Sequence, residues 1–152
     1  MDINDYIITQ SNFKKISSEV LNSNTTKNIY LIRFKDFIDE DSIIKDIISN
    51  KIKYVSCDCE EQNFIKEINT HYVDVEIPLN EDEHIKYIYN HLSNITKNKM
   101  DLIDIASKFY HKNNNYIFRV NNYITKVFKP LLDYIENILL REIKILDNNN
   151  HK

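Results

Sequence analysis

The chain contains no glycine among its 152 residues and only two prolines. Backbone turns that require positive φ are therefore left mainly to asparagine, which tolerates such conformations better than other residues that carry a side chain. Asparagine clusters mark the predicted corners at residues 22–24, 113–115, 121–122 and 148–150. A loop that wraps closely around a phosphate is normally built from glycine, so a phosphate site in this chain would have to be made without it.

The length and composition indicate one globular domain. A chain of 152 residues is long enough for one core but too short for two independent ones. Hydrophobic residues make up 42% of the chain and charged residues 28%, an ordinary globular balance. We therefore assign residues 1–147 to a single domain and expect a disordered tail at residues 148–152; an alternative domain boundary lies near residues 97–100.

The charge distribution argues against two classes of partner. The formal net charge is -3 and acids and bases are interleaved, so no basic face is available for a nucleic acid. No apolar run approaches the roughly 20 residues of a membrane span, and the start of the sequence carries acids where a secretory signal carries bases. We expect a cytoplasmic protein that contacts neither nucleic acid nor membrane.

Runs rich in β-branched and aromatic residues alternate with stretches in which apolar residues have helical spacing. Strands are predicted at residues 27–34, 52–58 and 71–79, and helices at residues 39–49 and 81–96. Strands that alternate with helices favour an α/β fold. We predict a single domain with a mainly parallel sheet flanked by helices.

The last part of the chain continues this alternation. Residues 116–130 read YIFRVNNYITKVFKP, which predicts a pair of strands around the corner at residues 121–122. Residues 130–146 predict a helix, with proline in its favoured first turn and apolar residues at helical spacing.

Three motifs in this order resemble one protein family. They read NIYLIRFKDF, IKYVSCDCEE and VDVEIPLNEDEHIKYIYNHLSNI, and they lie within residues 28–95. Their order and spacing resemble the first half of the small dual-specificity protein phosphatases, including the poxvirus type. The resemblance implies a phosphatase-like α/β domain.

The catalytic signature of that family, HCxxGxxR, is absent from the sequence. In the signature a cysteine thiolate attacks phosphorus, and an arginine six residues later binds the phosphate oxygens. Asn63 and Ile65 stand six residues after Cys57 and Cys59. The resemblance therefore implies a pseudophosphatase, a catalytically inactive binding or regulatory module that recognises a protein partner, in particular a phosphoprotein.

The resemblance also assigns the vestiges of an active site. If YIFRV replaces the strand that enters the phosphate loop, Val120 falls at the nucleophile and Lys126 at the arginine. Glu81 and Asp82 follow the IPL motif, in the region of the general acid. An alkyl side chain cannot be a nucleophile, so the loop could at most hold an anion weakly through Lys126. The degenerate anion-binding loop then consists of Val120, Asn121, Asn122, Tyr123, Ile124, Thr125 and Lys126.

Residues 109–151 resemble a second family, the protein kinases, over the small lobe alone. FYHKNNNYIFRVNNYITKVFKP and ENILLREIKIL resemble two antiparallel strands, a nucleotide-binding lysine and the helix glutamate that pairs with it. These residues would be Lys126 and Glu142, 16 positions apart. HKNNN stands where a glycine-rich loop belongs, and no catalytic-loop motif follows. The implied alternative is a degenerate small lobe or truncated kinase fragment without phosphotransfer activity.

The sequence predicts neither a metal site nor a cofactor. Cys57 and Cys59 lack the second pair of ligands that structural zinc requires. His84 and His91 stand seven residues apart, whereas a metalloenzyme pair stands four apart. Because no catalytic grouping is recognisable, we expect no enzymatic activity. A protein partner and weak binding of phosphate or nucleotide are the predicted interactions.

Overall fold

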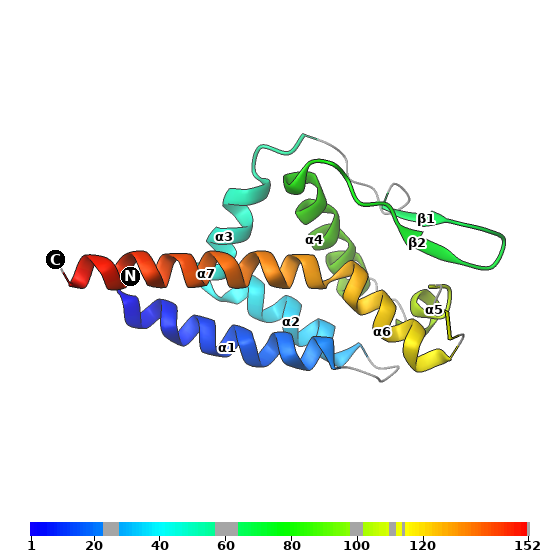
Figure 1. The fold of residues 1–152 in the computed structure, drawn as a ribbon, viewed down its shortest axis with the longest axis horizontal. Helices are drawn as coiled ribbons and strands as arrows, with labels where there is room; N and C mark the ends of the chain where they lie inside the picture. Colours follow the sequence, from blue (N-terminus) through cyan, green and yellow to red (C-terminus); the bar gives the residue numbers. More distant parts are fainter. Residues whose placement is uncertain (23–27, 57–63, 98–101, 110–111, 114, 152) are drawn as a thin grey trace.

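Helices form most of the chain in the computed structural model (Figure 1). The structure describes residues 1–22, 28–56, 64–97, 102–109, 112–113 and 115–151. Within these residues it contains seven helices and one two-stranded sheet. The helices are α1 (Ile3–Leu21), α2 (Ile29–Glu40), α3 (Ser42–Ile52), α4 (Glu81–Lys97), α5 (Leu102–Ala106), α6 (Tyr116–Val127) and α7 (Lys129–Asn150), and the strands are β1 (Ile65–Glu67) and β2 (Val73–Val75).

The predicted α/β fold with a mainly parallel sheet is wrong. The strands β1 and β2 pair antiparallel, with Ile65 opposite Val75. Among the described residues, parallel pairing is limited to one bridge between Val73 and Phe109. The kinase-like alternative for the fold of the C-terminal part is wrong as well, because the strand pair that it places in residues 116–130 is the helix α6 followed by the start of α7.

Helical spacing of the buried residues explains why two predicted strands are helices. In α2, which includes most of the predicted strand at residues 27–34, the buried residues are three and four positions apart: Leu31, Phe34 and Ile38. The buried residues of α6 repeat this spacing: Val120, Tyr123, Ile124 and Val127. Each set forms one continuous stripe on a helix, whereas on a strand its members would point to both faces. Packing of this stripe overrides the β preference of the individual residues.

Three predicted helices are confirmed. The helices predicted at residues 39–49, 81–96 and 130–146 correspond to α3, α4 and α7. Of the strand predicted at residues 71–79, only the three residues of β2 form a strand. Residues 52–56 of the remaining predicted strand form the end of α3 and a turn, and its last two residues lie outside the described part of the chain.

The long helix α7 lies at the centre of the bundle (Figure 1). It packs antiparallel to α1. The helix α2 packs against α1, and α3 and α4 pack against α7. The core between them is aromatic and aliphatic, with Phe13 of α1 and Phe34 of α2 in ring contact at 6.4 Å. On α7, Leu131, Ile135 and Leu139 are buried. The helix continues to Asn150, into the segment where the sequence predicts a tail.

The β hairpin is joined to the bundle through α5 and α6. The backbone N–H of Val73 donates to the carbonyl of Lys108 at 2.8 Å, just after α5. The guanidinium of Arg119 on α6 donates to the carbonyl of Ser107 at 3.0 Å. The first bond joins the hairpin to the segment after α5, and the second joins this segment to α6. The hairpin therefore lies far from the two chain termini (Figure 1).

Candidate functional site

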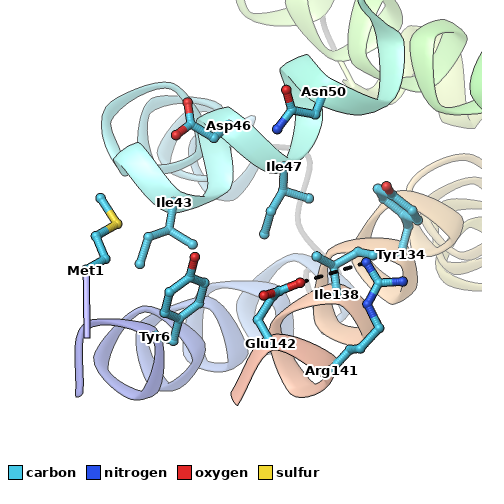
Figure 2. A pocket seen from close by; sticks show the side chains of 10 residues that line it. All are labelled: Met1, Tyr6, Ile43, Asp46, Ile47, Asn50, Tyr134, Ile138, Arg141 and Glu142. Atoms are coloured by element: carbon cyan, nitrogen blue, oxygen red, sulfur yellow. Dashed lines mark ion pairs between the residues drawn. The ribbon is translucent and has the colours of Figure 1, made fainter. Parts of the chain in front are cut away.

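A pocket lies between the start of α1, α3 and the middle of α7 (Figure 2). Its volume is about 360 Å³, near the lower end of the range of small-molecule sites, about 300–1,000 Å³. The side chains of three separate helices converge on it. They belong to Met1, Tyr6, Ile43, Asp46, Ile47, Asn50, Tyr134, Ile138, Arg141 and Glu142.

The spacing of residues along each helix explains how the pocket forms. On α3, Ile43 and Ile47 are one turn apart and point toward the pocket. Asp46 and Asn50 are also one turn apart and form its polar margin on the same helix. Asp41 fixes the start of α3, because its carboxylate accepts hydrogen bonds from the first N–H groups of the helix. The orientation of the α3 wall is therefore set by a defined N-cap.

The helix α7 supplies the opposite wall. Tyr134 and Ile138 are one turn apart, and Arg141 and Glu142 follow in the next turn. Arg141 Nη2 lies 3.9 Å from Glu142 Oε1, and the Arg141 side chain is 63% exposed, so this ion pair is weak. The pocket thus combines isoleucine and tyrosine side chains inside with two carboxylates and one guanidinium at its margin.

Lys51 connects three helices next to this pocket. Its Nζ lies 2.7 Å from Glu81 Oε1 and 2.8 Å from Asp82 Oδ1, at the start of α4. It also lies 4.8 Å from the centroid of the Tyr134 ring, a cation–π distance. Glu81 and Asp82, the predicted vestigial general acid, are therefore partners of a lysine.

The pKa shifts of this cluster fix its charge state. Burial lowers the pKa of Lys51, but hydrogen bonds to Asp82 and Glu81 outweigh it and raise this pKa to about 12. Burial raises the pKa of Tyr134, Glu81 and Asp82 raise it further, and Lys51 only partly opposes them. Near neutral pH Lys51 stays charged and Tyr134 stays protonated, so neither can act as a general base.

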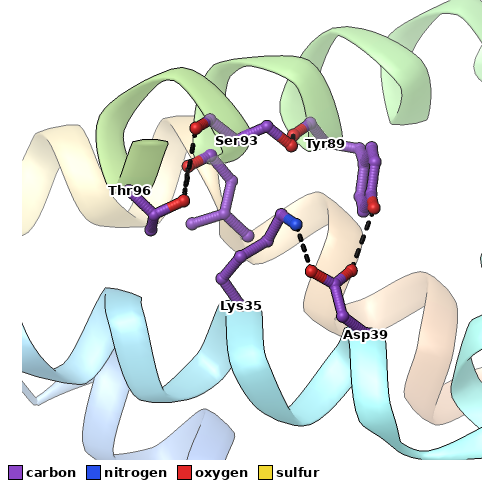
Figure 3. Close-up of polar contacts among 6 residues, drawn as sticks. Lys35, Asp39, Tyr89, Ser93 and Thr96 are labelled. Carbon is purple, nitrogen blue, oxygen red and sulfur yellow. Dashed lines mark hydrogen bonds and ion pairs between the residues drawn. The ribbon is translucent and has the colours of Figure 1, made fainter. Parts of the chain in front are cut away.

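A second polar network joins α2 to α4 (Figure 3). The Tyr89 hydroxyl donates to Asp39 Oδ1 at 2.9 Å, while Lys35 donates to Asp39 Oδ2 and lies over the Tyr89 ring at 5.0 Å. Ser93 and Thr96 donate to backbone carbonyls of their own helix, at 2.9 Å and 3.0 Å. The grouping of lysine, aspartate and tyrosine resembles an acid–base site in composition.

The pKa directions argue against acid–base chemistry in this network. Burial lowers the pKa of Lys35, but hydrogen bonding to Asp39 and the nearby Tyr89 outweigh it, and the pKa is raised. Burial and the hydrogen bond to Asp39 raise the pKa of Tyr89. Catalytic bases need a pKa near the working pH, whereas both groups are shifted away from it. The network therefore ties α2 to α4.

The predicted anion-binding loop is part of the helix α6. Its backbone N–H groups serve the helix, so they do not form an inward cradle for an anion. Val120, Tyr123 and Ile124 are buried, and the Tyr123 hydroxyl lies 2.8 Å from His91 Nε2 in the core. Of the other members, Asn121 and Asn122 are half-buried, and Thr125 and Lys126 are exposed.

Lys126 has a partner that neither resemblance predicts. Its Nζ lies 2.9 Å and 3.1 Å from the two carboxylate oxygens of Asp74 on β2. Glu142 lies in the middle of α7, at the pocket, up to about 24 Å along the helices from Lys126. The structure therefore does not bring together the kinase-like pair.

The histidines and cysteines that the sequence analysis weighed as metal ligands can be placed in part. The described residues hold no group of three or more histidines, cysteines and acids that could bind a metal ion. His84 and His91 lie on α4, where both are buried. Cys57 and Cys59 lie outside the described residues. Among the described helices, none has the length and apolar character needed to cross a membrane.

Comparison with known proteins finds no matching family, no similar curated protein and no similar solved structure. The described residues form a helical bundle with an attached hairpin and a pocket on its surface.

This pocket is not among the features predicted from the sequence. The usable signal is the four-residue spacing of Ile43 with Ile47 and of Asp46 with Asn50, which places an apolar and a polar row side by side on α3.

Proposed function

We propose that the protein is a non-catalytic binding module that holds an apolar side chain of a protein partner in the pocket between α1, α3 and α7. The observation that carries this proposal is the composition of the pocket. Isoleucine side chains from α3 and α7 line its interior, and the carboxylates of Asp46 and Glu142 stand on opposite walls. Such a pocket suits an apolar anchor that is followed by a polar group.

The charges at the margin favour a basic group next to the anchor. Among the side chains that line the pocket, Asp46 and Glu142 carry two negative charges and Arg141 carries one positive charge. Because the contact between Arg141 and Glu142 is long and exposed, a lysine or arginine of the partner can compete for Glu142. The same carboxylates repel a phosphate group. The proposal therefore departs from the phosphoprotein partner that the phosphatase resemblance implies.

The electrostatics nearby support binding without turnover. Tyr134, which lines the pocket, and Lys51, which lies over its ring, have raised pKa values and keep their protons near neutral pH. General acid–base catalysis needs a group that gains and loses a proton near the working pH. A pocket whose neighbouring groups do not change their protonation can still bind a ligand through burial of apolar surface.

Selection from a random peptide display library tests this proposal. We expect the protein to enrich peptides that share one large apolar residue beside lysine or arginine. Ile47→Trp fills the pocket and should reduce binding of these peptides at least tenfold. The matched control is Ile32→Trp on α2, where Ile32 is 39% exposed, and it should leave binding unchanged. Circular dichroism of both variants verifies that each remains helical.

Two results would reject the proposal. One is enrichment of peptides that bind Ile47→Trp as well as they bind the unchanged protein, because the binding surface would then lie elsewhere. The other is hydrolysis of an aryl phosphate by the pure protein, because a binding module has no turnover.

A further inference from the structure

One side of α7 faces away from the bundle and carries a regular series of side chains. The outer stripe consists of Asp133, Asn137, Leu140, Lys144 and Asp147, which are alternately four and three residues apart. All five are exposed, and the stripe lies opposite the buried residues of the same helix. Two long helices that pack side by side meet through residues at this spacing, which are usually apolar. In the outer stripe only Leu140 is apolar, so pairing through this stripe has to depend on its charges.

The charges of the outer stripe are self-complementary. With Lys129 included, they run positive at 129, negative at 133, positive at 144 and negative at 147. A second α7 laid antiparallel, with the twofold axis between Ile138 and Leu139, places Asp133 opposite Lys144 and Lys129 within one residue of Asp147. A twofold interface repeats every such pair, so each charge of the stripe meets its opposite.

We propose that two copies of this chain associate through the outer stripe of α7, with the two helices antiparallel. Leu140, which is 48% exposed, would meet Asn137 and Leu140 of the second copy near the axis. Within the described residues Lys144 has no acidic partner. The second copy supplies one in Asp133, which can also keep its contact with Lys129 at 2.8 Å.

The helix α1 adds apolar surface beside the stripe. The amide of Gln10 donates to Glu136 at 3.1 Å, which sets α1 and α7 in antiparallel register. Ile7 lies three residues before Gln10 and Leu140 four residues after Glu136, so both lie at the same level of the pair. Ile7 is 44% exposed. Burial of Ile7 and Leu140 from both copies gives the interface an apolar centre between its ion pairs.

This interface is distinct from the proposed peptide site. The pocket uses Tyr134, Ile138 and Glu142, which lie about a third of a turn around α7 from the outer stripe. Failure of the peptide selection would therefore leave the dimer proposal intact, and the reverse also holds.

Exchanging the two charges of the pair between Asp133 and Lys144 tests the proposal. Sedimentation velocity over a series of protein concentrations measures the association. For the unchanged protein we expect the apparent mass to rise with protein concentration, from 18.2 kDa toward twice that value. Lys144→Asp places acid against acid and should keep the protein monomeric over the whole series. Asp133→Lys added to Lys144→Asp restores the pair with reversed polarity and should restore the dimer.

Lys45→Asp on α3 is the control, because it makes the same change of charge at an exposed position outside the stripe. It should leave the dimer unchanged, and circular dichroism should show the same helix content for all variants. A monomeric unchanged protein at every concentration would overturn the proposal. So would a double variant that stays monomeric, or a control that loses the dimer as fully as Lys144→Asp.

Discussion

Lys51 and Lys35 show how single side chains hold neighbouring helices together. Lys51 on α3 binds two carboxylates at the start of α4 and lies over the ring of Tyr134 on α7. Lys35 on α2 binds Asp39 of its own helix, which in turn accepts a hydrogen bond from Tyr89 on α4. In both clusters burial of the lysine is offset by acidic partners, so the cost of burial is met without loss of charge.

His84 makes stability depend on pH. It lies in the first turn of α4, its ring is 5.9 Å from the ring of Phe64, and its Nε2 has no hydrogen-bond partner among the described residues. Burial lowers the pKa of His84, and Glu81 opposes this only in part. The positive end of the helix dipole also disfavours a charged imidazole there. The unfolded chain therefore binds the proton more readily than the folded one.

We expect the contribution of neutral His84 to be complete above its ordinary pKa of about 6.5 and to be lost as the pH falls below it. The midpoint temperature of thermal unfolding should decrease when the pH is lowered from 7.5 to 5.5. In His84→Leu this fall should be smaller, because the group that titrates is gone. An equal fall in both proteins would contradict the assignment. Scanning calorimetry at the two pH values makes the measurement.

At the scale of the helix, α3 depends on one residue for its start. Asp41 Oδ1 accepts from the backbone N–H groups of Ile43 and Ile44 at 3.0 Å and 3.1 Å. Asp41 Oδ2 accepts from the hydroxyl of Thr9 on α1 at 3.0 Å. The same carboxylate therefore caps α3 and joins it to α1, close to the wall of the pocket.

We expect Asp41→Ala to lower the free energy of unfolding by about 1–2 kcal/mol, the usual cost of a lost N-cap. Asp41→Asn keeps the side-chain acceptor and should cost much less. Thr9→Val removes only the bond between the helices and separates the two contributions. Urea denaturation measures all three. Equal losses in the alanine and asparagine variants would show that charge, and not capping, is the source.

The helices also show which parts of the fold can be predicted from sequence. The helices α3, α4 and α7 combine apolar residues at helical spacing with a start signal, and the two kinds of signal agree. The start signal is an acidic N-cap in α3, acids in the first turn of α4 and proline in the first turn of α7. In α2 and α6 they conflict, because residues such as Ile, Tyr and Phe favour strands while their spacing fits a helix. The prediction followed composition where spacing was the better guide.

The pocket could not be predicted in the same way. Its walls come from residues 1–6, 43–50 and 134–142, and no local pattern specifies that these segments meet. The ion pair of Lys51 with Glu81 could not be predicted either, since it joins residues that are 30 positions apart. Contacts of this kind follow from how the helices pack, and the predicted sheet placed the helices elsewhere.

At the scale of the whole molecule, α7 is the element on which the bundle depends. We expect Ile135→Ala, at a fully buried position of α7, to lower the free energy of unfolding by about 2–5 kcal/mol. Ile145→Ala makes the same change on the same helix at a position that is 46% exposed, and it should cost less than about 0.5 kcal/mol. Chemical denaturation gives both values. Similar losses at the two positions would show that α7 does not pack as described.

The pairing of α1 with α7 sets a limit on when the protein can fold. Leu21 ends α1 and Lys129 begins α7, so ribosomes must add 108 residues before the main partner of the first helix starts to emerge. At about 5–20 residues per second this takes roughly 5 to 20 seconds. During that time α1 can meet α2 but exposes the side that α7 later covers. Folding of the bundle is therefore completed only after most of the chain has been synthesised, and newly made protein is most open to chaperones and proteases in that interval.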